Sequence, residues 1–260
     1  MLDRRRFFAL TAAGAAVAAL PRVAFAQGKP FSLPPLGYAY EALEPHIDAR
    51  TMTLHLTAHH AGYVDALNAL MDVFPELQSR SAAWMLLNLG KVPEAARASV
   101  RTNAGGHVNH SLFWRAMTPM GAGEPSGRLA DAIERDFGSF ESMKAEFETL
   151  GERVVGSGWV WIVRARQNGG PLRVVSTASN ANPMMEDHFP LLVNDVWEHA
   201  YYIKHDHRRL DYLRGWWAVV DWEEVARRFA RSDHNARERW ASEGDLLLAP
   251  GTARTERIAL

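Results

Sequence analysis

The sequence lacks cysteine. None of its 260 residues is a cysteine, which excludes a disulfide framework and any metal site built on thiolates. A metal ion in this protein must therefore be held by nitrogen and oxygen ligands, a set that suits Mn, Fe, Zn or Cu.

A surplus of charge of one sign is also missing. The chain has 29 basic and 30 acidic residues, a formal net charge of −1, so it has no broad positive field of the kind that holds nucleic acid. No internal repeat or low-complexity tract is present, and 47% hydrophobic with 23% charged residues is ordinary for a globular protein. We expect one or two globular domains and no nucleic-acid partner.

The first 26 residues have the features of an export signal. Residues 4–6 are arginines, residues 9–20 form an apolar run too short to cross a bilayer, and Ala24 and Ala26 are small residues at a cleavage site. The arginines followed by two phenylalanines resemble a twin-arginine signal; an ordinary secretory signal and an uncleaved amphipathic start are the alternatives. Cleavage near Ala26 removes four Arg and one Asp and leaves a net charge of −4. We predict a periplasmic protein with no stable membrane anchor.

The first half of the remaining chain has the hydrophobic period of helices. Apolar residues recur at helical intervals over residues 51–73, 81–89 and 94–117, and Gly105 and Gly106 weaken the middle of the last helix. Prolines and glycines fill residues 119–125 and predict a linker.

The second half mixes helices and strands. Helices are predicted over 139–151, 197–205 and 221–231, and strands over 159–164, 172–177 and 189–193, the first two joined by a hairpin signal at 167–170. The predicted domains are therefore 27–118, mostly helical, and 126–231, with a loosely ordered tail at 232–260.

Histidines gather in three segments, residues 54–63, 105–114 and 195–202. His55, His59 and Tyr63 lie at i, i+4 and i+8, which is one face of a helix. Asp195 and His199 lie four apart, and on a helix both would also share a face. A metal cage of three imidazoles and one carboxylate from separate elements is therefore possible. Spacing does not decide which histidines bind; the candidates on chemistry alone include His59, His60, His107, His205 and His207, although the last two lie in a solvated charge run.

Four sequence blocks resemble the iron/manganese superoxide dismutases. They are residues 45–63, 103–114, 156–161 and 195–202, in the order of that family, and the likeness runs from about Phe31 to Arg228. The resemblance implies an α+β fold, with an N-terminal helical hairpin followed by an α/β domain with a three-stranded antiparallel sheet. It also implies a homodimer that dismutates superoxide with one Mn or Fe ion per subunit.

The resemblance also implies residue roles. The metal ligands it implies are His55, His110, Asp195 and His199, with Tyr63 and His59 as a gateway pair for the substrate. Glu198 is expected to reach a metal-bound histidine of the other subunit, and Tyr202 its gateway histidine. Around the ligands, the resemblance implies an aromatic wall and an arginine that draws the anion into the funnel: Trp114, Trp159, Trp161, Trp197 and Arg209.

One position departs from the family pattern. A Gln side chain usually hydrogen-bonds the solvent on the metal; here Gly106 occupies one of its two possible positions, as in manganese-type members, and Asn180 occupies the other. The position of this amide resembles that of manganese-type members, but Asn180 is one methylene shorter than Gln. Manganese is therefore favoured only slightly over iron.

Two alternatives to a dismutase are a catalytically silent metal-binding protein of the same fold and a metallohydrolase. The latter is disfavoured because no Glu is placed as a general base.

Overall fold

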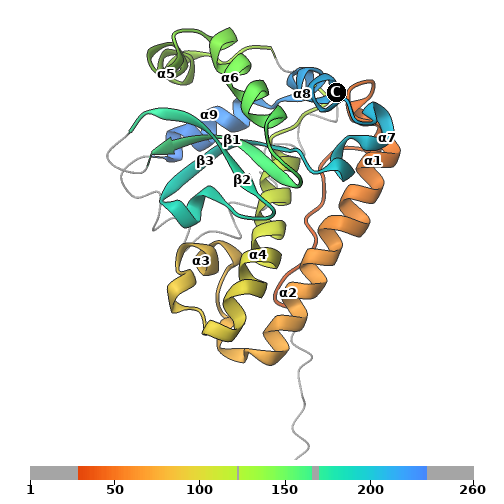
Figure 1. The fold of residues 1–260 in the computed structure, drawn as a ribbon, viewed down its shortest axis with the longest axis vertical. Helices are drawn as coiled ribbons and strands as arrows, with labels where there is room; N and C mark the ends of the chain where they lie inside the picture. Colours follow the sequence, from red (N-terminus) through yellow and green to blue (C-terminus); the bar gives the residue numbers. More distant parts are fainter. Residues whose placement is uncertain (1–28, 122, 166–169, 233–260) are drawn as a thin grey trace, which may run out of the picture.

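The computed structural model describes residues 29–121, 123–165 and 170–232 (Figure 1). The predicted export signal, most of the predicted hairpin turn and all of the predicted tail except Ser232 lie outside these residues. Within the part of the chain that the structure describes, no helix is long and apolar enough to cross a membrane.

The N-terminal half is a helical hairpin. Its first arm is continuous, from α1 (Ala49–Leu54) through a π-helical segment (His55–His60) into α2 (Ala61–Val73), and its second arm is α4 (Glu94–Arg115). The two arms lie side by side, with α3 (Ala82–Leu87) beside α4 (Figure 1). Short 3-10 turns complete the half at Tyr40–Leu43, Pro75–Leu77 and Leu89–Lys91.

Local sequence explains where these helices begin. The Asp48 carboxylate accepts a hydrogen bond from the Thr51 backbone N–H at 2.9 Å, and the Ser81 hydroxyl accepts one from the Trp84 N–H at 3.0 Å. Both are N-caps that satisfy a free donor in the first turn. The three predicted helices of this half are confirmed.

The C-terminal half packs helices on a small sheet. Its three strands are β1 (Gly158–Ala165), β2 (Leu172–Ala178) and β3 (His188–Asp195), all antiparallel, with β1 in the centre of the order β2-β1-β3. The predicted sheet and the α+β fold are confirmed. The helices are α5 (Gly127–Phe137), α6 (Phe140–Glu152), α7 (Tyr202–His205), α8 (Arg209–Trp216) and α9 (Trp222–Arg231), with 3-10 turns at Pro183–Glu186, Glu198–Ala200 and Trp217–Val219.

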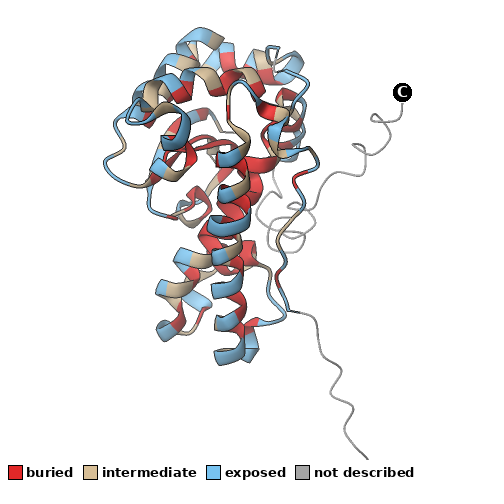
Figure 2. Cartoon of the chain, turned by 90° about the vertical axis from the view of Figure 1, so that its right-hand side faces the viewer, coloured by how far each residue is buried: buried red, intermediate tan, exposed pale blue. Residues whose placement is uncertain are grey.

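Strand β1 is covered on both faces. Trp159 lies against His110 of α4 on one face, whereas Val160 on the other contacts the α6 region near Gly151. Successive strand residues point to opposite faces, so the first six residues of β1 are all buried. Figure 2 shows this burial along the centre of the molecule, with the outer sides of the helices exposed.

Two details of the sequence prediction need correction. The helix predicted over 197–205 is instead a 3-10 turn at Glu198–Ala200 followed by the single-turn α7, because Tyr201 between them has a non-helical φ of −144°. Two helices, α5 and α8, were not predicted at all. The buried side of α5 has Leu129, Ala132 and Ile133 at i, i+3 and i+4, which is a helical spacing, so its sequence did carry the signal for this helix.

Gly105 and Gly106 do not interrupt α4, which is helical through both. They allow close packing instead. A Cβ on Gly105 would lie 2.1 Å from the backbone oxygen of Asn180, and one on Gly106 would lie 2.5 Å from the Tyr63 ring. The two glycines therefore let the loop after β2 and the first arm of the hairpin approach α4 closely.

Candidate metal centre

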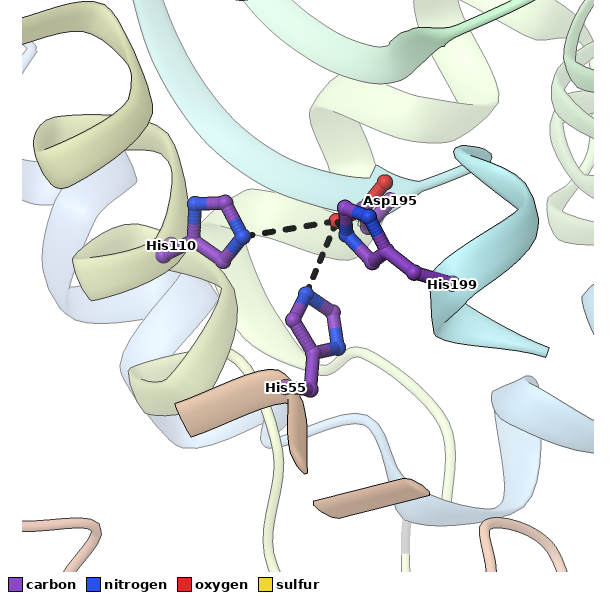
Figure 3. A group of neighbouring side chains, drawn as sticks. All are labelled: His55, His110, Asp195 and His199. Carbon is purple, nitrogen blue, oxygen red and sulfur yellow. Dashed lines mark hydrogen bonds and ion pairs between the residues drawn. The ribbon is translucent and has the colours of Figure 1, made fainter. Parts of the chain in front are cut away.

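Four side chains from four elements converge at one point between the two halves (Figure 3). His55 comes from the π-helical segment, His110 from α4, Asp195 from the end of β3, and His199 from the 3-10 turn that follows. One ligand atom from each lies within 4.8 Å of the other three. An ion at about 2.1 Å from each atom would need only small side-chain adjustments.

Asp195 is the hub of this group. Its Oδ2 lies 3.0 Å from His55 Nε2, 3.1 Å from His199 Nε2 and 3.7 Å from His110 Nε2. Its other oxygen accepts a hydrogen bond from the Trp197 backbone N–H at 2.8 Å. The carboxylate is thereby fixed with one oxygen turned to the imidazoles.

His110 shows that the group fits a metal ion. Its Nδ1 lies 2.7 Å from the Gly106 carbonyl oxygen, which can only accept, so Nδ1 carries the proton and Nε2 has a free lone pair. That Nε2 is buried and has no hydrogen-bond partner. A buried nitrogen without a partner is costly, and a metal ion in the group would satisfy it. Fixing a ligand histidine through its second nitrogen is typical of metal sites.

The protonation states also suit metal binding. Burial lowers the pKa of His55 to about 4 and the pKa of His110 well below its ordinary value. Burial opposes ionisation of Asp195, but His199 and His55 outweigh it and lower its pKa. Near neutral pH His55 and His110 therefore offer neutral imidazole and Asp195 offers a carboxylate, as metal coordination requires.

Asp195 and His199 do not share a helical face, contrary to the prediction from their spacing. Asp195 is the last residue of β3, paired across the sheet with Trp159. His199 follows in a 3-10 turn. The two side chains meet because the chain turns between them, and no helix contains both.

The π-helical segment explains why two histidines face α4. In an α-helix, residues five apart lie about 140° apart around the axis, whereas a π-helix bonds i to i+5 and brings them to one side. The rings of His55 and His60 accordingly both lie near His110, at 4.9 and 5.2 Å.

His60 and His107, two of the candidate ligands, are not in the metal group and form a separate hydrogen-bonded chain. Trp114 Nε1 donates to His60 Nδ1 at 3.0 Å, and His60 Nε2 lies 2.9 Å from His107 Nδ1. Because indole can only donate, His60 must carry its proton on Nε2 and donate to His107. His60 therefore orients Trp114 beside the centre, a role that spacing alone does not signal.

Aromatic rings enclose the ligands. Trp114 lies 4.7 Å from His55, Trp159 lies 4.9 Å from His110, and Trp197 lies 5.4 Å from His199, all measured between ring centroids. Trp161 is one ring further out, 6.1 Å from Trp159. Trp114, Trp159 and Trp161 are almost fully buried, so the centre has low water access on that side.

The predicted gateway residues lie on the more open side. His59 is exposed and stacks on His199 at 4.2 Å, and Tyr63 is half-buried with its ring 5.4 Å from His110. Burial raises the pKa of the Tyr63 hydroxyl, with Asn180 acting in the opposite direction. The hydroxyl is therefore protonated at neutral pH and able to donate.

Asn180 lies in the inner wall. It is 1% exposed, and its Oδ1 accepts a hydrogen bond from Trp159 Nε1 at 3.3 Å. Its Nδ2 is buried without a hydrogen-bond partner. Asn180 nevertheless lies close enough to the Tyr63 hydroxyl to lower its pKa through a side-chain hydrogen bond, so the amide belongs to the open side of the centre as well.

The remaining predicted residues lie further from the ligands. Glu198 is exposed and Tyr202 is 47% exposed, and their expected contacts to a second subunit stay predictions. Arg209 donates to the Tyr201 hydroxyl and to four backbone oxygens, those of residues 151, 152, 154 and 156. Its guanidinium thus ties down the connection from α6 to β1; its predicted place in a funnel stays a prediction.

Comparison with known proteins gives two family matches that together span most of the chain. Residues 30–118 match the alpha-hairpin domain of the iron/manganese superoxide dismutases, and residues 125–228 match their C-terminal domain. Among curated proteins, the chain is 50% identical over 209 residues to superoxide dismutase [Mn] 3 of Leptolyngbya boryana, covering 80% of this chain and 87% of that protein. It is 49% identical over 194 residues to superoxide dismutase [Mn] of Thermus aquaticus, covering 75% and 94%. It is 45% identical over 199 residues to superoxide dismutase [Mn] of Listeria monocytogenes, covering 76% and 97%.

Proposed function

The chain belongs to the iron/manganese superoxide dismutase family, and on that basis we propose how its centre works. The protein is a superoxide dismutase, which converts two superoxide anions and two protons to dioxygen and hydrogen peroxide. The observation that carries this function is the convergence of His55, His110, Asp195 and His199, with His110 Nε2 buried and unpartnered. Manganese or iron held there supplies the one-electron redox couple; zinc cannot, because it does not change valence.

Two groups of residues prepare the centre: some fix the ligands and others exclude water. His110 is held in its ligand tautomer by Gly106, and Asp195 is held by the Trp197 N–H, so the ligand set is formed before any ion arrives. The indoles of Trp114 and Trp159 exclude water from the inner side. Excluding water strengthens the electrostatic interactions inside the centre.

The residues on the more open side of the centre can supply protons. Tyr63 is half-buried, is protonated at neutral pH and packs on Gly106 beside the ligand His110. It can donate a proton to the peroxide product and recover it from solvent. Asn180 stands beside it and acts on the Tyr63 hydroxyl through a side-chain hydrogen bond, and its buried Nδ2 can also donate to a molecule in the centre. His59, exposed and stacked on His199, completes the entry side.

Manganese is the metal we favour. The Tyr63 ring fills the space where a side chain on residue 106 would lie, since a Cβ there would meet the ring at 2.5 Å. A Gln at this position, the alternative source of the amide, would have to displace Tyr63. The amide must then come from Asn180, which is the manganese-type arrangement. The three relatives compared above are also named as manganese enzymes.

Assembly and location are separate proposals. Leu54, Tyr202 and Ile203 are apolar or aromatic side chains with 40–47% exposure, and they belong to α1 and α7, two helices that contact each other. Together with exposed Glu198, they suit a homodimer interface next to the centre.

We further propose export to the periplasm by the twin-arginine signal. Replacing Arg4 and Arg5 by Lys should leave the enzyme in the cytoplasm, and unchanged export would rule that route out.

The function is tested with His110→Ala. Purified protein should hold about one redox-active ion per subunit and dismutate superoxide, and His110→Ala should lose both metal and activity because it removes a ligand. His207→Ala, an exposed histidine outside the metal group, is the matched control and should keep both. Protein loaded with Mn or Fe that shows no dismutation would favour the silent metal-binding alternative. Loss of metal from the control as well would discredit the ligand assignment.

A further inference from the structure

The segment that precedes the first 3-10 turn lies along the helical hairpin. These residues, 29–38, are here called the strap; they form no helix or strand and run beside the two long helices (Figure 1). The strap is nonetheless fixed, since Phe31 and Leu36 are buried. Asn68 of α2 holds its start: the Asn68 Oδ1 accepts from the Phe31 N–H at 3.0 Å, and the Asn68 Nδ2 donates to the Phe31 carbonyl oxygen at 2.9 Å. A segment fixed in this way can position the side chains that it contacts.

One end of the strap reaches the indole of Trp114 through two histidines. The Phe31 ring lies 6.0 Å from the His107 ring, measured between centroids, at an angle of 67°, so the two pack edge to face. His60 Nε2 donates to His107 Nδ1 at 2.9 Å, and His60 Nδ1 accepts from Trp114 Nε1 at 3.0 Å. Both histidines are buried. The contacts that begin at Phe31 therefore end on the indole nitrogen.

The other end of the strap holds the same residue by its backbone. The Tyr38 hydroxyl donates to the Trp114 carbonyl oxygen at 3.0 Å. Trp114 is fully enclosed, and its ring lies edge-on to the ligand His55, with 4.7 Å between centroids and an angle of 75°. Contacts from Phe31 and Tyr38 thus converge on an indole that lies directly against a metal ligand.

We propose that the strap positions the Trp114 indole against the metal centre, with His107 as the positioning residue at the Phe31 end. His107 acts as a hydrogen-bond acceptor. Without it the Nε2 proton of His60 has no partner, and a buried donor without a partner is costly. The His60 ring, held by one bond instead of two, can then turn towards water, and the Trp114 N–H loses its aligned acceptor. Water that reaches His55 weakens the electrostatic interactions inside the centre. The effect on turnover rests on the proposed function, whereas the effect on the indole does not.

A pair of substitutions at His107 tests the acceptor. His107→Leu removes it, whereas His107→Asn keeps one, because the amide oxygen of Asn lies near the place of the imidazole Nδ1. Ultraviolet resonance Raman spectra of the metal-loaded proteins report the hydrogen bonds of indole nitrogens, and the spectrum of Trp114→Phe identifies the Trp114 signal. In His107→Leu we expect this signal to shift towards a weaker hydrogen bond and dismutation per bound metal ion to fall several-fold. His107→Asn should retain most of both.

His188→Leu is the matched control. It makes the same change at a partly buried histidine at the opposite end of β3 from Asp195, so the Trp114 signal and the rate should stay unchanged. A lower melting temperature in His107→Leu with an unchanged Trp114 signal would show that His107 only supports the fold. Equal effects of His107→Leu and His107→Asn would exclude the acceptor role.

Phe31→Ala tests the strap itself. It removes the ring against His107 but no member of the hydrogen-bonded chain. The Trp114 signal should shift in the same direction as in His107→Leu, and by less. If the Phe31 end acts through His107, adding Phe31→Ala to His107→Leu should change nothing further, whereas independent contacts would add. Additive effects contradict the proposal. Should His107→Leu not fold, Phe31→Ala decides alone, and an unchanged Trp114 signal rules the strap out.

The same measurements separate this inference from the proposed function. Enzyme that dismutates superoxide, with a Trp114 signal and a rate that His107→Leu leaves unchanged, refutes the positioning role alone. Metal-loaded protein that does not dismutate, but whose Trp114 signal shifts in His107→Leu and not in His107→Asn, refutes the function alone.

Discussion

The glycines of the helical hairpin allow a direct test of how the site is packed. Three of them lie inside the two arms: Gly62 in α2, and Gly105 and Gly106 in α4. Replacing a helical glycine by alanine normally stabilises a protein by about 0.5–1 kcal/mol, because it lowers the conformational freedom of the unfolded chain. All three substitutions share this gain, so any difference between them reports the space around the new Cβ.

The structure predicts a different outcome at each position. Around Gly62 nothing lies within 4 Å of the new Cβ, so Gly62→Ala should show the full gain. At Gly105 the Cβ would lie 2.1 Å from the Asn180 backbone oxygen, which no side-chain rotation can relieve. Overpacking of this kind costs about 1–3 kcal/mol or more, so we expect a net loss of stability and a shifted Asn180. At Gly106 the Cβ meets the Tyr63 ring, so activity should fall because the ring must swing away from His110.

Calorimetric melting of the metal-loaded proteins measures these changes. With about 2–4 °C per kcal/mol for a chain of this size, Gly62→Ala should melt about 1–4 °C higher, and Gly105→Ala several degrees lower. Superoxide turnover and bound metal, measured on the same samples, should fall for Gly105→Ala and Gly106→Ala and stay unchanged for Gly62→Ala. If Gly105→Ala melts as high as Gly62→Ala with full activity, the close approach of the two halves at Asn180 is wrong.

Three further outcomes test other parts of the structure. Asn180→Gln lengthens the buried amide and should lower the midpoint potential of the bound metal, because a donated hydrogen bond stabilises the more negative solvent that accompanies the oxidised ion; an unchanged potential would show that Nδ2 does not face the centre. Arg209→Gln removes the charge and the contacts with four carbonyl oxygens; if the guanidinium only ties the backbone down, melting should fall while the salt dependence of kcat/KM stays unchanged, and a weaker salt dependence would favour anion attraction. Glu224→Gln leaves the buried Arg228 unpaired and should cost about 3–5 kcal/mol at neutral pH. Arg228 and Arg115 hold the Glu224 pKa below 4.5 against the effect of burial, so the loss should shrink as acid protonates Glu224 below about pH 4.5, and denaturation followed against pH measures this.

Hydrophobic period was enough to predict the hairpin and the sheet. Residues 51–73 and 94–117 carry long helical patterns, and both helices are present close to those limits. The runs at 159–164 and 172–177 are the paired strands β1 and β2. Helix α8 (Arg209–Trp216) could not be predicted this way, because its eight residues are too few for a clear period and three of them are charged. Its place is set by contacts with α6, far away in the sequence.

The ligand set could not be chosen from spacing. His55 and Asp195 are 140 residues apart and meet only through the packing of the hairpin on the sheet. Three histidines of one segment have the same chemistry but different surroundings. His55 faces Asp195, His59 is exposed, and His60 accepts a hydrogen bond from Trp114. Family resemblance separated them because it encodes tertiary contacts that a local pattern does not contain.

The π-helical segment shows why α-helical spacing could not predict which histidines share a side of the first arm. Counting in α-helical steps puts His55 and His60 about 140° apart, on different sides of the first arm. One wider turn from His55 to His60 brings both rings against His110, so one segment supplies both a ligand and the residue that orients Trp114. The wider turn lacks the i to i+4 hydrogen bonds of an α-helix. The sequence within it contains no glycine or proline that would indicate a departure from the α-helix. Packing against α4 stabilises the π-helical segment. It can therefore be predicted only from the contact between the two arms, and not from the local sequence.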